Sequence, residues 1–117
     1  MTATILIVDD SATMRALVRG ALEADQHAVV EAPNGEAALA TLAGMSTGVD
    51  LVITDVIMPQ MDGLSLTRAL RDDPRFAATP ILVLGHAENL LGLASDMRRV
   101  TSTIYRHAEA TANQGAT

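Results

Sequence analysis

The sequence predicts an α/β protein built on a doubly wound parallel sheet. Three short apolar runs, 4–8, 51–54 and 80–84, have the length of strands and lack the alternation of a half-exposed strand. Such runs are typical of strands buried on both faces, as in parallel sheets. The stretches between them carry apolar residues at helical spacing, and strands that alternate with helices indicate βαβ units.

The composition bounds the protein to a single domain with an aliphatic core. Of the 117 residues, 49% are apolar, but there is only one Phe, one Tyr and no Trp. There is no Cys, which excludes disulfides and thiolate metal sites. The formal net charge of −6 argues against a nucleic-acid surface. With no signal peptide and no apolar run of membrane-spanning length, we expect a cytoplasmic protein that does not contact membranes.

The first half of the chain predicts two strands and two helices. Residues 4–8 form the first strand, and Ser11 is a good N-cap for the helix that follows. Residues 27–31 form a weaker strand, a turn lies at 33–35, and residues 36–42 form the second helix. The apolar residues at helical spacing are Met14, Leu17, Val18, Ala21 and Leu22 in the first helix and Ala38, Leu39 and Leu42 in the second.

The next stretch predicts a strand, a helix and another strand. The strand at 51–55 ends in a carboxylate, and the chain then turns at 62–63. A third helix opens at Gly63 and is stopped by Asp72-Asp73-Pro74, before the strand at 80–84. Its residues expected to face inward are Leu66, Ala69 and Leu70.

Three carboxylates follow the ends of two buried strands. Asp9 and Asp10 follow the first strand, and Asp55 ends the strand at 51–55. These strands are expected to be neighbours, so the three side chains meet at the sheet edge where open α/β sheets bind ligands. Carboxylates held together repel unless a cation lies between them, and an all-oxygen site suits a hard ion such as Mg²⁺. One such Asp is often only a solvated loop residue, so the prediction rests on all three.

Three motifs together resemble the receiver domains of two-component response regulators. They are ILIVDDS at 5–11, LVITDVIMPQMDG at 51–63 and TPILVL at 79–84. The resemblance covers residues 3–86, and the single-domain chemotaxis regulators are closest in size. It implies a flavodoxin-like fold whose central Asp accepts a phosphoryl group from a histidine kinase, after which the domain signals by binding a downstream protein.

The resemblance also implies roles for individual residues. Asp55 would be the phosphoacceptor, Asp10 a direct Mg²⁺ ligand and Asp9 a water-mediated one, and the backbone carbonyl of Ile57 would complete the protein's ligands. Ile57 and Ala87 occupy positions where the family tunes hydrolysis with polar side chains. Both are apolar here, so a slowly decaying phosphoryl group is predicted.

Two residues of the family's switching machinery are missing. Gly85 stands where the family has a Thr or Ser hydroxyl, and the chain has no Lys to bind the phosphoryl oxygens. Counting along the chain puts Arg106 or His107 near that Lys position. The alternative function is therefore a pseudo-receiver, a dimeric interaction module without phosphorylation-driven switching. A Mg²⁺-dependent phosphatase ranks last, because Ile57 stands where a second acid is needed two residues after Asp55.

The C-terminal third departs from the family. We divide the chain into a receiver core at 1–86, an atypical helical segment at 87–113 and a tail at 114–117. The helical segment is favoured because no Gly or Pro occurs from 93 to 114. Its apolar stripe comprises Leu90, Ala94, Met97, Thr101, Ile104 and Ala108.

Two architectures follow for this part of the chain. The favoured one has four strands and one long helix from 87 to about 112, and the other adds a short fifth strand at 102–106. Both leave one sheet face without the family's last helix, and the strand at 81–84 could form an apolar edge. Exposed apolar surface favours association, so we expect a homodimer through the long helix.

Overall fold

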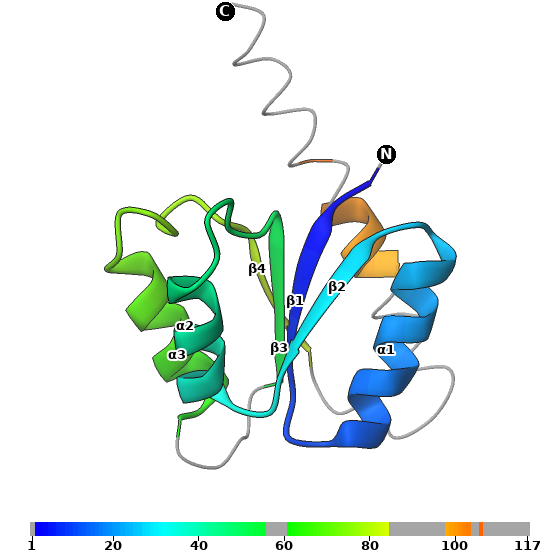
Figure 1. The fold of residues 1–117 in the computed structure, drawn as a ribbon, viewed down its shortest axis with the longest axis horizontal. Helices are drawn as coiled ribbons and strands as arrows, with labels where there is room; N and C mark the ends of the chain where they lie inside the picture. Colours follow the sequence, from blue (N-terminus) through cyan, green and yellow to red (C-terminus); the bar gives the residue numbers. More distant parts are fainter. Residues whose placement is uncertain (1, 56–60, 85–97, 104–105, 107–117) are drawn as a thin grey trace, which may run out of the picture.

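A four-stranded parallel sheet forms the centre of the molecule (Figure 1). The computed structural model describes residues 2–55, 61–84, 98–103 and 106. Within them the strand order is β2-β1-β3-β4, which confirms the doubly wound fold. The strands are β1 (Thr4–Val8), β2 (Ala28–Ala32), β3 (Leu51–Asp55) and β4 (Ile81–Leu84), and the helices are α1 (Ala12–Ala24), α2 (Gly35–Ala43) and α3 (Gly63–Arg71).

Helices cover both faces of the sheet, which divides the core into two layers. α1 and the helical residues 98–103 lie on one face, and α2 and α3 lie on the other (Figure 1). Side chains of β1 point alternately into the two layers. Ile5 and Ile7 pack on the α1 side, and Leu6 and Val8 pack on the α2 side. This explains the unbroken apolar runs in the sequence. In the part of the chain that the structure describes, no helix could cross a membrane.

Each of the three helices begins behind a polar side chain that accepts a backbone N–H of the first turn. These residues are Ser11, Asn34 and Asp62. Ser11 was predicted in this role, whereas residues 33–35 were expected to be a turn. The structure instead starts α2 at Gly35, because the Asn34 side chain accepts the Ala37 N–H at 2.8 Å. β2 lies at 28–32, one residue later than the predicted 27–31.

The described part of the C-terminal third is helical. Residues 98–103 and 106 have helical backbone, so the alternative of a fifth strand at 102–106 is not supported. The remainder of the predicted helix over 87–112 lies outside the described residues. The expectation of a bare sheet face is wrong at Val100, which is only 1% exposed and packs in the same core layer as Ile5 and Leu22.

β4 is the edge strand of the described sheet, as expected if no fifth strand is added. Ile81, Leu82 and Val83 are half-buried rather than fully exposed. Arg99 donates a hydrogen bond from Nη2 to the Val83 carbonyl at 3.3 Å. An arginine bonded to a strand carbonyl hinders pairing with another strand, so this edge is partly protected.

Candidate metal centre

Strand register brings the three acidic residues together. Val8 pairs with Thr54 across β1 and β3, which places the next residues, Asp9 and Asp55, at the same level of the sheet. One carboxylate oxygen from each of Asp9, Asp10 and Asp55 lies within 4.8 Å of the others. Asp55 is buried with 6% exposure, Asp9 is half-buried and Asp10 is exposed. The expected convergence of the three carboxylates is therefore observed.

Asp9 is held through its backbone and its side chain. Its N–H donates to the Ala32 carbonyl of β2 at 3.2 Å, which extends the β1–β2 pairing by one residue. Its Oδ1 accepts the Ser11 N–H at 2.9 Å. Its backbone carbonyl accepts a hydrogen bond from Arg15 Nη1 at 2.6 Å. The loop that carries the acids therefore has fixed geometry where it leaves the sheet.

The electrostatics of the cluster favour a cation. Burial raises the pKa of Asp9, and the negative charges of Asp55 and Asp10 raise it further, while the Ser11 N–H opposes the shift. Keeping the Asp9 carboxylate ionised therefore costs free energy when no cation is present. A divalent ion would relieve that cost, and the oxygen-only donors suit Mg²⁺ rather than a metal that prefers nitrogen or sulfur. Asp9, Asp10 and Asp55 thus fit a magnesium site.

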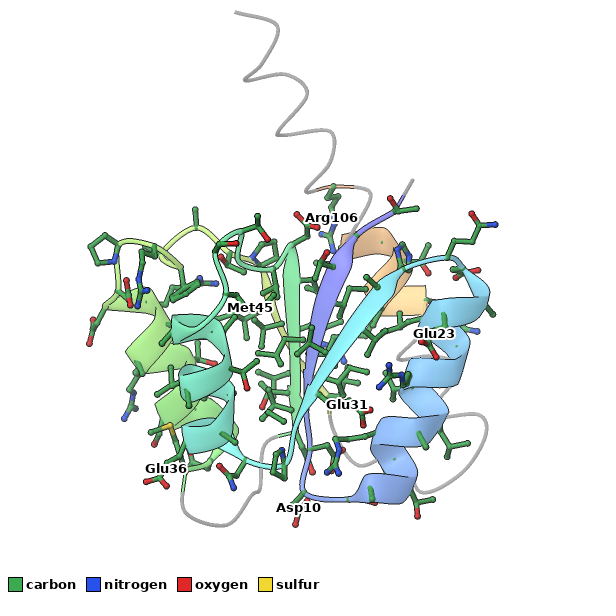
Figure 2. All side chains as sticks on the ribbon, in the orientation of Figure 1. Asp10, Glu23, Glu31, Glu36, Met45 and Arg106 are labelled. Atoms are coloured by element: carbon green, nitrogen blue, oxygen red, sulfur yellow. The ribbon has the colours of Figure 1, made fainter. Side chains whose placement is uncertain are left out.

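Of the other candidate residues singled out in the sequence, Arg106 is among the described ones. Ile57, Gly85, Ala87 and His107 lie outside the described residues. Arg106 lies at the end of the sheet opposite Asp10 (Figure 2), so the structure does not bring it to the carboxylates.

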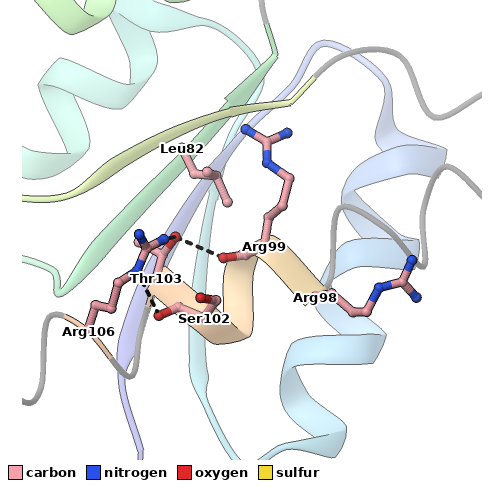
Figure 3. A pocket seen from close by; sticks show the side chains of 6 residues that line it. All are labelled: Leu82, Arg98, Arg99, Ser102, Thr103 and Arg106. Atoms are coloured by element: carbon pink, nitrogen blue, oxygen red, sulfur yellow. Dashed lines mark hydrogen bonds between the residues drawn. The ribbon is translucent and has the colours of Figure 1, made fainter.

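Arg106 instead lines a groove beside β4. The groove has a volume of about 410 Å³ (Figure 3). Arg106 Nε donates to the Ser102 carbonyl at 3.4 Å, one helical turn earlier. The six lining residues are Leu82, Arg98, Arg99, Ser102, Thr103 and Arg106. Leu82 of β4 supplies the apolar side chain of the lining, and the positive charges come from the arginines of the helical segment.

Sequence reasoning missed a network of charges beside the acids. Arg15 Nε bonds Glu31 Oε1 at 3.1 Å, and Arg19 Nη1 bonds Glu31 Oε2 at 2.5 Å. Arg19 also pairs with Glu23 of its own helix. The spacing of four residues between Arg15 and Arg19 does indicate in the sequence that both lie on the same face of the helix. Their shared partner on β2, however, emerges only from the way α1 packs on the sheet.

Known proteins provide three kinds of likeness. A family model described as the response regulator receiver domain matches residues 5–100. The chain is 41% identical over 80 residues to the transcriptional regulatory protein ResD of Bacillus subtilis, which is 68% of this chain and 31% of the relative. It therefore spans less than a third of that relative's length.

Solved structures support the same fold over most of the chain. The chemotaxis protein CheY4 of Vibrio cholerae is 29% identical, with a TM-score of 0.71 over 86% of this chain and 99% of that one. The signal receiver domain of a signal transduction histidine kinase from Syntrophus aciditrophicus is 26% identical. Its TM-score is 0.75 over 92% of this chain and 91% of that one.

Proposed function

Since this chain belongs to the response regulator receiver domain family, we propose that it accepts a phosphoryl group at Asp55 from a histidine kinase in two-component signalling. The observation that carries the proposal is the position of Asp55 at the carboxyl end of β3, with its carboxylate beside those of Asp9 and Asp10. A kinase partner is also consistent with the solved relative that is itself the receiver domain of a histidine kinase.

The proposed chemistry uses the acids in two ways. Asp9, Asp10 and Asp55, with the backbone carbonyl of Ile57, would hold Mg²⁺. The ion would offset negative charge between the carboxylates and the phosphoryl oxygens of the donor. An oxygen of Asp55 then attacks phosphorus, and the P–O or P–N bond to the leaving group breaks. Asp9 and Asp10 would hold the ion beside the Asp55 carboxylate, and the burial of Asp55 limits access of water.

Phosphorylation is tested by intact mass after incubation with Mg²⁺ and a small phosphodonor. We expect the mass of one phosphoryl group on the native chain and none on Asp55→Asn. Asp62→Asn is the matched control, because Asp62 is an exposed N-cap outside the cluster and its substitution should leave the addition intact. No addition to the native chain would contradict the proposal and favour the pseudo-receiver. Donor turnover without a stable addition would favour the phosphatase.

Two sequence features favour the pseudo-receiver as a second candidate function. Gly85 offers no hydroxyl and the chain contains no Lys, so the phosphoryl group lacks two of the family's usual contacts. We propose that the protein signals by binding a partner rather than by catalytic turnover. In the pseudo-receiver, binding would not depend on the state of Asp55. Comparing partner capture by the native chain and by Asp55→Asn, each treated with phosphodonor, separates the two.

We also propose a homodimer formed through the C-terminal helical segment. β4 is the edge of the described sheet, and the adjacent helical residues expose Arg98, Thr101 and Ser102. Light scattering over micromolar concentrations tests this proposal. A mass that rises toward twice that of the chain supports it, and a constant monomer mass contradicts it.

A further inference from the structure

We propose that Arg15 is a positioning residue for the metal centre, acting through the backbone of Asp9. The inference rests on the proposed function, because the role assigned to Arg15 is to raise the affinity of the acid cluster for Mg²⁺. Arg15 lies on α1, outside the set of oxygen donors, and contacts Asp9 through the carbonyl rather than the carboxylate.

The Arg15 side chain is itself fixed on two sides. It is only 18% exposed, and its Nη1 donates to the Asp9 carbonyl at 2.6 Å while its Nε donates to Glu31 Oε1 at 3.1 Å. Glu31 is held in turn by Arg19, through its other oxygen. The planar guanidinium can bond two groups in different directions at once, which a lysine cannot reproduce with the same geometry. A rigid support therefore reaches from β2 to the acidic loop.

The contacted carbonyl belongs to the peptide that joins Asp9 to Asp10. The N–H of Asp9 is bonded to Ala32 and its carboxylate to the Ser11 N–H. The bond from Arg15 fixes the remaining backbone group of Asp9, and so sets the plane of the peptide from which Asp10 continues. Asp10 is exposed and follows this peptide directly. Loss of the Arg15 bond should therefore disturb the relative placement of two of the three proposed ligands.

The charge of Arg15 and its positioning role predict opposite changes in Mg²⁺ affinity when Arg15 is removed, so one measurement distinguishes them. A cation beside a Mg²⁺ site repels the ion, so removal of Arg15 would tighten Mg²⁺ binding if its charge alone mattered. If Arg15 holds the ligands in place, its removal weakens binding. Partners that orient metal ligands typically change affinity by about tenfold or more when they are lost.

The test measures the dissociation constant for Mg²⁺ by calorimetry at fixed ionic strength. We expect Arg15→Met, which keeps most of the aliphatic stem, to weaken binding about tenfold. Arg19→Met is the matched control: it removes the same charge from the same helix and frees one oxygen of Glu31, but the hydrogen bonds of Arg19 go to Glu31 and Glu23 rather than to Asp9. We expect its affinity to be unchanged or tighter. Arg15→Met binding as tightly as the native chain, or more tightly, would overturn the proposal.

Arg15→Lys and the amide spectrum of the metal-free protein separate the geometry of Arg15 from its charge. Arg15→Lys keeps the charge, so any loss of affinity reports geometry, and we expect a loss smaller than that of Arg15→Met. If Arg15→Met does not fold, Arg15→Lys decides, and native affinity in it would refute the proposal. In metal-free amide NMR spectra, the Asp10 resonance should shift in Arg15→Met and stay in place in Arg19→Met.

Failure of the proposed function is recognised separately in the native chain. If native protein does not bind Mg²⁺, or if Asp10→Asn binds it equally well, the metal centre itself is refuted and the role of Arg15 is lost with it. If native binding is present and lost in Asp10→Asn, only the Arg15 variants decide the inference.

Discussion

Asp9 is the residue at which the electrostatic cost of the site is clearest. Burial and the neighbouring carboxylates raise its pKa above the ordinary value of 3.8. A carboxyl group whose folded pKa is raised favours the fold in its protonated form, so stability is lost as the pH rises from 3.8 through the raised pKa. At neutral pH the ionised side chain therefore opposes folding of the metal-free protein.

Because ionised Asp9 destabilises the metal-free protein, removing its charge should stabilise it. Asp9→Asn should raise the melting temperature of the metal-free protein by about 2–5 °C, because it removes the charge and keeps an oxygen for the Ser11 N–H. The same variant should gain less from added Mg²⁺. Thermal unfolding with and without Mg²⁺ measures both effects. Asp62→Asn is the comparison: the Ser65 N–H lowers the pKa of Asp62, so we expect no stabilisation there.

Gly35 is a second residue with a measurable consequence. A Cβ at this position would lie 2.7 Å from Cγ and 2.9 Å from Cβ of Met61, the residue just before the cap of α3. Gly35 is buried at the start of α2, so the absence of a side chain is what lets Met61 pack there. The contact joins the beginnings of two helices on the same face of the sheet.

The second prediction concerns this contact. Gly35→Ala should destabilise the protein by about 1–3 kcal/mol through overpacking. Combining it with Met61→Ala should recover part of that loss, because the smaller side chain makes room. Gly20→Ala is the control: nothing lies within 4 Å of that added Cβ, and Ala in a helix should stabilise by about 0.5–1 kcal/mol. Additive effects of Gly35→Ala and Met61→Ala in urea unfolding would contradict the proposed packing.

At the scale of elements, the helical residues 98–103 are joined to the sheet by Val100. Its side chain is 1% exposed and belongs to the core layer of β1, β3 and α1, while its neighbour Thr101 is exposed. This contact is long in sequence, since the other members of the layer come from the first 84 residues. The segment thus contributes to the stability of the receiver core.

The third prediction tests that attachment. Val100→Ala should lower the free energy of unfolding by roughly 2 kcal/mol, because it removes two buried methyl groups and leaves a cavity. Thr101→Ala, one residue away on the exposed side, should change it by less than about 0.5 kcal/mol. Equal effects of the two substitutions in denaturant unfolding would show that the segment does not pack on the sheet.

Across the whole molecule, several carboxylates outside the site stabilise the fold when they are ionised, whereas ionised Asp9 destabilises it. Arg19 lowers the pKa of Glu31, the Ser65 N–H lowers that of Asp62, and Arg75 lowers that of Asp73. The ordinary pKa is 4.5 for Glu31 and 3.8 for the two aspartates. Each carboxylate contributes its full stabilisation when the pH is above its ordinary pKa, and this stabilisation is lost as the pH falls through the lowered pKa of the folded protein.

The stability of the protein should therefore depend on both pH and Mg²⁺. Metal-free protein should lose stability below about pH 4, where the three favourable carboxylates become protonated. Mg²⁺ should stabilise the protein at neutral pH and progressively less toward low pH, because protons compete for the ligands. Thermal unfolding across this range, with and without Mg²⁺, measures both trends. A stabilisation by Mg²⁺ that is independent of pH would contradict binding to ionised carboxylates.

Local sequence patterns were sufficient to predict the four strands, the three helices and the convergence of the three carboxylates. Unbroken apolar runs reveal strands that are buried on both faces, and Ser11 marks a helix start, because both signals are local. Asp9, Asp10 and Asp55 could be placed together because parallel strands carry their carboxyl ends to one edge. To predict this convergence it was enough that β1 and β3 are neighbours, and the fold class already implied that they are.

How side chains far apart in the sequence contact one another is seen in the tertiary structure alone. That structure joins Arg15 to the Asp9 carbonyl, packs Val100 in the core layer of Ile5, and puts Arg106 at the end of the sheet opposite Asp10. Each of these facts depends on the angle and depth at which a helix packs, and spacing along the chain does not encode either. Local patterns fix which residues form an element, whereas the free energy of packing all the elements together fixes which of their side chains touch.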